Sequence, residues 1–159
     1  MAVTIDDLIR RSYGGLYVAA GGGTQNTNAT PGVYNKLTQF ATAGAASYLV
    51  VPSVANNNIQ VLKSGIWLCL FSISFDPGHD SEFAFQVWAG TSGAETARTN
   101  VTGEVRIKTA SDLACVAASG FIVLVTYDVV DLRVANLTEA SKSVAVKYAN
   151  IHLLRVGGA

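Results

Sequence analysis

Apolar and polar residues alternate with a period of two along most of the chain after residue 12. This is the period of a β-strand, in which successive side chains point to opposite faces of a sheet. Groups of Gly, Pro, Asn, Asp and Ser separate the alternating runs and favour turns, and residues 21–32 form the longest predicted loop. Many short strands at regular spacing predict an all-β fold, an antiparallel sandwich of the jelly-roll type. The predicted strands span residues 14–20, 33–40, 47–51, 57–65, 65–75, 82–90, 101–109, 113–125, 128–134 and 143–156.

Residues 1–12 have a different pattern, with apolar residues at helical spacing. Thr4 followed by Asp7 favours the start of a helix, since the pair resembles a capping box. The sequence therefore predicts two parts, an N-terminal arm with a short amphipathic helix at residues 1–12 and a single jelly-roll domain at residues 13–159. A helix this short is marginal in water, so we expect the arm to pack on a partner surface or, alternatively, on its own assembly as a lid. The arm residues expected to bind the partner are Ile5, Leu8, Ile9, Arg10 and Arg11.

The strand predicted at residues 65–75 is apolar on both faces near its start. One face begins with Ile66, Leu68 and Leu70 and becomes polar only at Ser72. A sheet with one solvated face alternates cleanly from end to end, as the strand at 101–109 does. We therefore predict that Ile66, Leu68 and Leu70 lie in a subunit interface and that the strand at 101–109 faces solvent. The opposite face of the strand at 65–75 is predicted to fill the core. It consists of Trp67, Cys69, Phe71, Ile73 and Phe75.

The composition also favours contacts between subunits. Charged residues make up 14% of the chain, against roughly 25% in an average globular protein, while hydrophobic residues make up 50%. No apolar run reaches the roughly 18 residues of a membrane span. A formal net charge of +0 does not favour nucleic acid or a membrane surface as a partner. The first residues lack the apolar stretch of a signal peptide, so we expect synthesis in a cytoplasm.

The motifs of common enzyme sites are not found in the sequence, which contains no GxSxG, HExxH, CxxC, GxxxxGK or GxGxxG. Cys69 and Cys115 each lie in an apolar run and are predicted to be buried free thiols. His152 has no acidic neighbour in the sequence and is predicted to be structural. We therefore expect no enzymatic activity and no cofactor.

One segment offers ligands for a divalent cation, because Asp76, His79, Asp80 and Glu82 lie close together in the sequence. Pro77 and the following Gly favour an ordinary turn between two strands, with polar residues solvating its tip. The turn is the interpretation that we prefer.

Two further groups of residues have a functional and a structural interpretation. Four tyrosines in the first third of the chain would suit a sugar-stacking surface, but aromatic residues in strands more often belong to cores or subunit contacts. Three N-x-[ST] triplets matter only in a glycosylating compartment, and we interpret them as chance. The residues concerned are Tyr13, Tyr17, Tyr34 and Tyr48, and Asn28, Asn100 and Asn136.

Two motifs show a resemblance to a known family. The first is Gly65 followed at alternate positions by aromatic and apolar residues as far as Ile73. The second is the apolar run 119–125, a tight turn at Tyr127 and Asp128, and a short alternating strand. The pattern resembles the tumour-necrosis-factor-like jelly roll, shared with the globular heads of the complement recognition collagens. The sequence departs from it at Tyr127, where the family has Gly, and at Cys69, where an aromatic residue is common.

The resemblance implies a homotrimer, with Ile66, Leu68 and Leu70 in the trimer interface. Collagen repeats and a membrane stalk are missing from the sequence. What remains is similar to the compact jelly rolls that tailed bacteriophages use as head decoration, or cement, proteins. The expected function is therefore that of a virion structural protein, made in the host cytoplasm, that binds the major capsid protein on the outside of a phage head. The alternative is a receptor- or carbohydrate-binding domain of a phage tail fibre or tip.

Overall fold

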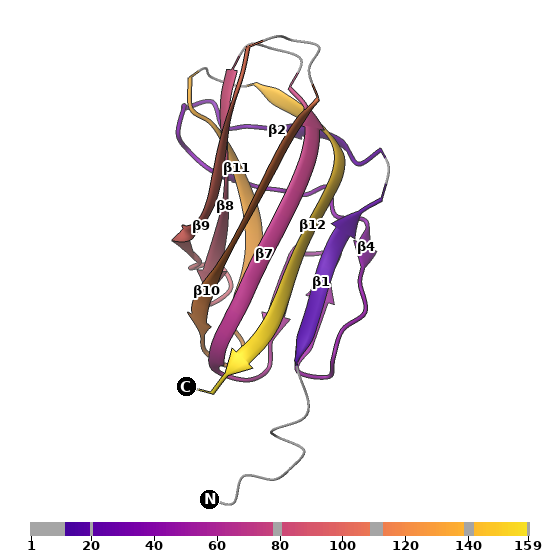
Figure 1. Ribbon diagram of the computed structural model, residues 1–159, viewed down its shortest axis with the longest axis vertical. Coiled ribbons are helices and arrows are strands. Elements are labelled where there is room, and N and C mark those ends of the chain that lie inside the picture. The colour runs from indigo at the N-terminus through magenta and orange to yellow at the C-terminus, as the bar shows by residue number, and fades with distance from the viewer. Residues whose placement is uncertain (1–11, 20, 78–80, 109–112, 139–141, 159) are drawn as a thin grey trace, which may run out of the picture.

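The computed structural model describes residues 12–19, 21–77, 81–108, 113–138 and 142–158, which form two antiparallel sheets packed face to face (Figure 1). No helix occurs among these residues, and therefore none that is long and apolar enough to cross a membrane. The fold class predicted from the sequence, an all-β antiparallel sandwich, is confirmed. The helix predicted in the arm lies outside the described residues.

The first sheet, called sheet A, has the strand order β10-β7-β12-β1-β4. A further strand, β2, pairs with the beginning of β12, beyond the end of β1. Strand β1 begins and β12 ends at the same end of the sandwich, where Tyr13 pairs with Leu154 (Figure 1). The strands of sheet A are β1 (Tyr13–Val18), β2 (Gly23–Asn26), β4 (Thr42–Ala43), β7 (Gly65–Asp76), β10 (Ala114–Leu124) and β12 (Ser143–Gly157).

The second sheet, sheet B, has the order β5-β6-β11-β8-β9, and β3 pairs with β11 beside β6. Strand β9 contains an irregularity, because Gln86 pairs with Thr102 while the next residue, Val87, pairs with Arg98. The strands of sheet B are β3 (Asn35–Lys36), β5 (Val50–Ser53), β6 (Asn58–Val61), β8 (Ser81–Gly90), β9 (Thr96–Ile107) and β11 (Val129–Asn136).

The core lies between the sheets and is built from alternate residues of each strand. The inward face of β7 is buried as predicted, from Trp67 at 0% exposed to Ile73 at 2%. Phe75 meets two rings of sheet B, with centroid distances of 5.6 Å to Phe83 in an edge-on arrangement and 5.0 Å to Phe85. Such pairs stabilise a fold beyond the area they bury, so this aromatic cluster fastens the two sheets together.

The extra residues of β9 connect the two sheets along one side of the sandwich. The side-chain amide of Asn100 donates a hydrogen bond to the carbonyl oxygen of Phe121 on β10, at 2.7 Å. A Cβ atom at Gly120 would lie 2.8 Å from the carbonyl oxygen of Asn100, so this approach of β9 to β10 requires glycine. The edge strands of both sheets are therefore joined through a side chain.

Two segments differ from the prediction. Residues 21–32 are not a continuous loop, because β2 forms within them beside β12. The buried side chain of Gln25 explains this strand, since its Oε1 accepts a hydrogen bond from the backbone N–H of Thr38 at 2.8 Å. The predicted strand at 33–40 is reduced to β3, and the short strand β4 was not predicted.

The turn between β10 and β11 is confirmed, and it leads the chain from sheet A to sheet B. Tyr127 has a φ of 73°, in the left-handed region that favours glycine. Asp128 stabilises the turn by accepting a hydrogen bond from the N–H of Val125 at 2.9 Å. The departure from the family pattern at Tyr127 thus leaves the turn conformation in place.

Candidate functional site: the outer face of sheet A

The outward side chains of sheet A form rows, because the strands are paired in register. Leu68 of β7 pairs with Phe121 of β10 and with Leu154 of β12, and Leu154 pairs with Tyr13 of β1. All members of this first row are apolar or aromatic. The row crosses four strands that are far apart in the sequence, so only the folded chain brings its members together.

The apolar surface continues beyond this row toward the end of β10. Phe121, Val123 and Val125 are 62%, 60% and 61% exposed. Ile66 pairs with Val123 and is itself 38% exposed. Exposed apolar patches larger than a few hundred Å² mark interaction sites in soluble proteins. This end of sheet A therefore has the character of a protein contact surface.

The next two rows have a polar centre. Asn150 of β12 donates a hydrogen bond from Nδ2 to Oγ of Ser72 on β7, at 2.7 Å. His152 lies one row nearer the apolar end, opposite Leu70 and beside Gly15 of β1. A shallow hollow is lined by these side chains together with residues of β10, namely Leu70, Ser72, Ala117, Ser119, Asn150 and His152.

The His152 ring is half-buried on this face. A Cβ atom at Gly15 would overlap its Nδ1, so the ring lies over the backbone of β1 at a position that only glycine leaves open. Burial lowers the pKa of His152, because removal from water penalises the imidazolium form. That His152 has only a structural role stays a prediction.

The two thiols differ, and one prediction is wrong. Cys69 is buried, and burial raises its pKa to about 12. Cys115, which was expected to be buried, is exposed. It pairs with Ser74 on the outward side of sheet A, while its neighbours Ala114 and Val116 point into the core. The strand is apolar on both faces, so composition did not reveal which residues point inward.

Charged side chains are sparse on sheet A. Strands β1 and β10 contain none, and the rows described above contain none either. The guanidinium group of Arg155, near the end of β12, donates to the carbonyl oxygen of Ser64 at 3.2 Å and 3.3 Å. The outer face of sheet A is therefore electrically neutral over most of its width.

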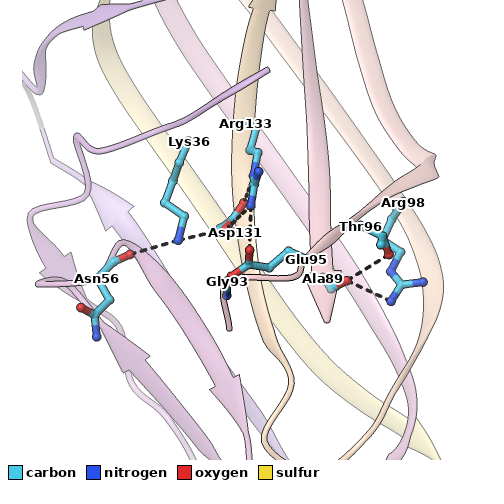
Figure 2. A network of polar contacts seen from close by, with 9 residues as sticks. All are labelled: Lys36, Asn56, Ala89, Gly93, Glu95, Thr96, Arg98, Asp131 and Arg133. Carbon is cyan, nitrogen blue, oxygen red and sulfur yellow. Dashed lines mark hydrogen bonds and ion pairs between the residues drawn. The ribbon is translucent and has the colours of Figure 1, made fainter. Parts of the chain in front are cut away.

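The outer face of sheet B instead carries a network of ion pairs (Figure 2). The carboxylate of Asp131, whose side chain is fully buried, lies 2.8 Å from Nε of Arg133 and 3.0 Å from Nζ of Lys36. Arg133 also reaches Glu95 at 3.1 Å and stacks over Trp88, with its guanidinium carbon 4.2 Å from the ring centroid. The network ties β3 and the loop before β9 to β11.

The pKa values of this network follow from opposite charges close together. Burial acts to raise the pKa of Glu95, but hydrogen bonds from backbone N–H groups and the charges of Lys36 and Arg133 outweigh it, so the pKa is lowered. Burial acts to lower the pKa of Arg133, while hydrogen bonds and charges of Asp131 and Glu95 raise it. Each charge is compensated by a neighbour, which is a structural arrangement rather than an open ligand site.

The structure brings together some of the predicted site residues. Ile66, Leu68 and Leu70 lie on the outer face of sheet A, and their role in an interface stays a prediction. The arm residues Ile5, Leu8, Ile9, Arg10 and Arg11 lie outside the described residues. So do His79 and Asp80 of the candidate cation ligands. Within the described part of the chain, no three His, Cys, Asp or Glu side chains are grouped to hold a metal ion.

The side chains of the three N-x-[ST] triplets are engaged in the fold. Asn100 donates to Phe121 across the two sheets. Asn136 is 1% exposed and accepts a hydrogen bond from the N–H of Thr138. Asn28 donates to the side chain of Asn35 at 3.2 Å. The interpretation of the triplets as chance stays a prediction.

Sequence reasoning missed most of the surface around Ile66, Leu68 and Leu70. Its further members are Tyr13, Tyr17, Phe121, Val123, Val125, Tyr148, Leu154 and Val156. The continuous apolar run at 121–125 was a signal, because a strand buried on one face only would alternate. Two of the four tyrosines considered for sugar stacking, Tyr13 and Tyr17, lie on this face, while Tyr34 packs against Trp88 at a centroid distance of 6.2 Å.

Comparisons with known proteins rest on structure alone. No family model and no curated protein sequence matches the chain. The structure is similar to Eiger TNF from S. frugiperda, with a TM-score of 0.64 and 10% identity over 93% of this chain and 95% of that one. It is also similar to the globular domain of the zebrafish complement 1qA protein, with a TM-score of 0.62 and 9% identity over 93% and 99%. For murine APRIL the TM-score is 0.59 at 10% identity, over 92% and 100%. The chain therefore has the tumour-necrosis-factor-like jelly-roll fold, as the resemblance in its sequence predicts.

Proposed function

We propose that this chain is a non-enzymatic structural protein that works as a homotrimer, with the outer face of sheet A buried between subunits. The observation that supports this proposal is the neutral apolar surface around Leu68, Phe121 and Leu154. Each Å² of apolar surface removed from water contributes roughly 25 cal/mol. Covering this surface would therefore stabilise an assembly in proportion to the apolar area that becomes buried.

The choice of three subunits rests on the resemblance to the family. A physical argument supports a ring of subunits in general. If the edge of one subunit packs on the face of the next, the two contacting surfaces are different, so the contact is heterologous. A finite assembly built from such contacts must close into a ring. Strand β10 is the edge strand of sheet A and carries Phe121 and Val123, so it offers both an edge and part of the face.

Sedimentation velocity at micromolar concentration tests the assembly. We expect a particle of roughly three times the 16.6 kDa subunit mass. The exposed thiol of Cys115 provides a second readout, since burial of the outer face should slow its reaction with a maleimide, whereas Cys69 should be unreactive in any case. A monomer with a fast-reacting Cys115 would contradict the proposal.

We further propose that the trimer binds the outside of a phage head, in contact with the major capsid protein, after synthesis in the host cytoplasm. Support comes from the resemblance in the pattern of the sequence described above and from the amphipathic spacing of apolar residues in the arm at residues 1–12. The arm joins the jelly roll at Tyr13, at the end of the sandwich where β12 ends. The arm is thus attached at one end of the domain. If the arm binds the capsid, the jelly-roll domains of the trimer would project away from the capsid surface.

Co-sedimentation with expanded, empty capsids tests this second proposal. The full-length trimer should bind, and a variant lacking residues 1–11 should stay trimeric but lose binding. If the shortened protein binds equally well, the arm is not the anchor. Binding to host cells or glycans instead of capsids would favour the alternative, a receptor- or carbohydrate-binding domain of a tail fibre or tip.

A further inference from the structure

Among the described residues, the outer face of sheet A has one histidine, His152, and it lies near the middle of the face. His152 is on β12, the central strand of the order β10-β7-β12-β1-β4. Its ring borders the hollow that Leu70, Ser119 and Asn150 also line, and it covers the backbone at Gly15. Among the described residues none forms a hydrogen bond with the ring. A proton added to this imidazole therefore has water as its only partner.

The groups that face His152 from the neighbouring strands do not compensate a positive charge. Strand β7 presents Leu70 opposite the ring, with the uncharged Leu68 and Ser72 on either side. Strand β1 presents Gly15 between Tyr13 and Tyr17. Neither strand therefore presents a carboxylate beside the ring that could balance an imidazolium.

The remaining titratable groups on this face are more distant along the strands. Strand β10 contributes Cys115, which lies two rows away, and β7 contributes Asp76, which lies three rows away at the end of the strand. Strand β12 contributes Lys147, Tyr148 and Arg155. Arg155 would repel a second positive charge, and its guanidinium is already engaged with Ser64. No carboxylate of the described residues lies in the rows that contain or flank His152.

We propose that His152 makes the assembly acid-sensitive: the homotrimer forms while the imidazole is neutral and comes apart when it is protonated. This inference rests on the proposed trimer. Burial between subunits would remove the water that solvates the imidazolium, and an isolated charge in a dry contact is strongly unfavourable. The separated subunit leaves the ring half-exposed, so it accepts the proton more readily than the trimer does.

Proton linkage gives the sign and the size of the effect. The pKa of His152 is already lowered in the single subunit and should be lower still in the trimer. The separated subunit is the reference state, so assembly is unaffected above the lowered pKa that His152 has there and weakens as the pH falls through it. One proton per subunit gives three per trimer, so the dissociation constant should rise by up to about 1000-fold per pH unit in the steep region.

The experiment is sedimentation velocity of the full chain between pH 7.5 and 5.0, with circular dichroism to follow folding. We expect the parent protein to change from trimer to folded monomer over this range. His152→Gln, and His152→Asn in case the first variant folds poorly, keep a neutral polar side chain and should stay trimeric at pH 5.0. The chain has two histidines, so His79→Gln is the matched control and should dissociate as the parent does.

The outcomes separate this inference from the proposed function. A parent trimer that persists at pH 5.0, or one that dissociates equally in His152→Gln, would overturn the role of His152 and leave the trimer standing. Loss of the acid response in His79→Gln would assign it to the other histidine and overturn the proposal as well. A parent protein that is monomeric even at pH 7.5 would refute the proposed assembly itself, and the inference with it.

Discussion

The two sheets enclose the same core but present different outer faces. Sheet B carries charged side chains that compensate one another, with the buried carboxylate of Asp131 between Lys36 and Arg133. Sheet A exposes rows of apolar and aromatic side chains such as Phe121, at 62% exposed, with no charge in those rows to solvate them. The charges on the first face are compensated within a single chain, and the apolar surface on the second face is the one that we propose is buried between subunits.

The difference shows that the inward residues are determined by packing in the core, whereas the outward residues are determined by what surrounds each outer face. The inward residues of β7 and β11 are equally apolar, because both line the core. The outward residues of sheet B are surrounded by water and by side chains of opposite charge, so charged residues are suitable there. Over sheet A the surroundings that suit the outward residues are dry and uncharged. The following changes test that contrast, in order of decreasing expected effect.

Leu68→Asp should have the largest effect, because it places a charge in the centre of the first apolar row. An unpaired charge in a dry contact costs several kcal/mol, so we expect complete dissociation at micromolar concentration. Sedimentation velocity measures the mass, and circular dichroism verifies that the monomer is folded.

Lys108→Asp is the matched control, since it introduces the same carboxylate at an exposed position just beyond β9 in sheet B. It should leave the mass and the assembly constant unchanged. If both variants dissociate, or neither does, the contrast between the two outer faces is not the basis of assembly.

Asp131→Asn should have the next largest effect, on folding rather than assembly. It leaves Lys36 and Arg133 without their shared carboxylate at a buried position. Removing one partner of a buried ion pair typically costs about 3 kcal/mol or more. Urea unfolding in the monomeric Leu68→Asp background measures this cost free of any contribution from assembly. A loss below about 1 kcal/mol would show that the network does little to hold sheet B together.

Glu95→Gln should have a smaller effect that depends on pH. The carboxylate lies at the outer end of the network, and we expect its loss to cost on the order of 1 kcal/mol at pH 7. Its pKa is lowered in the folded protein, so its stabilisation is present above the ordinary glutamate pKa and is lost as the pH falls through the lowered value. The difference between variant and parent should therefore vanish at low pH. If the difference in the free energy of unfolding between variant and parent does not change with pH, the charge of Glu95 does not stabilise the folded protein.

Tyr127→Gly should have the smallest effect and the opposite sign. The residue joins the two sheets with a φ of 73°, a conformation that costs a non-glycine residue about 1–2 kcal/mol. Glycine relieves this cost but loses more chain entropy on folding, so a net gain of about 0.5 kcal/mol is expected. Tyr127→Ala keeps the unfavourable φ and should give no gain in thermal unfolding. If both variants change the unfolding temperature equally, the change is caused by loss of the tyrosine ring and not by relief of the positive φ.

The sequence predicted the parts of the fold where alternation is unambiguous. In β7 large apolar residues recur at every second position, so the inward face from Trp67 to Phe75 was correct. In β10 small and apolar residues occupy both faces, so the pattern did not reveal that Cys115 points outward. Strand β2 was missed because its polar residues are held by a contact from another segment, the hydrogen bond between Gln25 and Thr38.

The candidate site was predictable only in part, for a geometric reason. The apolar start of β7 indicated that Leu68 faces outward without being solvated, and the structure places it on the outer face. That Phe121, Leu154 and Tyr13 lie in the same row depends on the register of three strand pairs. Register is a property of the folded sheet, and the order of residues along the chain does not contain it directly.

The hydrogen bond from the Asn100 side chain to the carbonyl oxygen of Phe121 bears on the size of the proposed assembly. A free edge strand with unpaired backbone groups recruits further strands and leads toward fibres. In this chain a side chain of β9 occupies the backbone carbonyl of Phe121 on the edge strand of sheet A, and Gly120 lets the two strands approach. Strand addition is thereby blocked at that point, which leaves the faces of the sandwich for the proposed association. In the proposed trimer, an apolar face makes the contact between copies while this edge is closed to further strands, as a particle of fixed size requires.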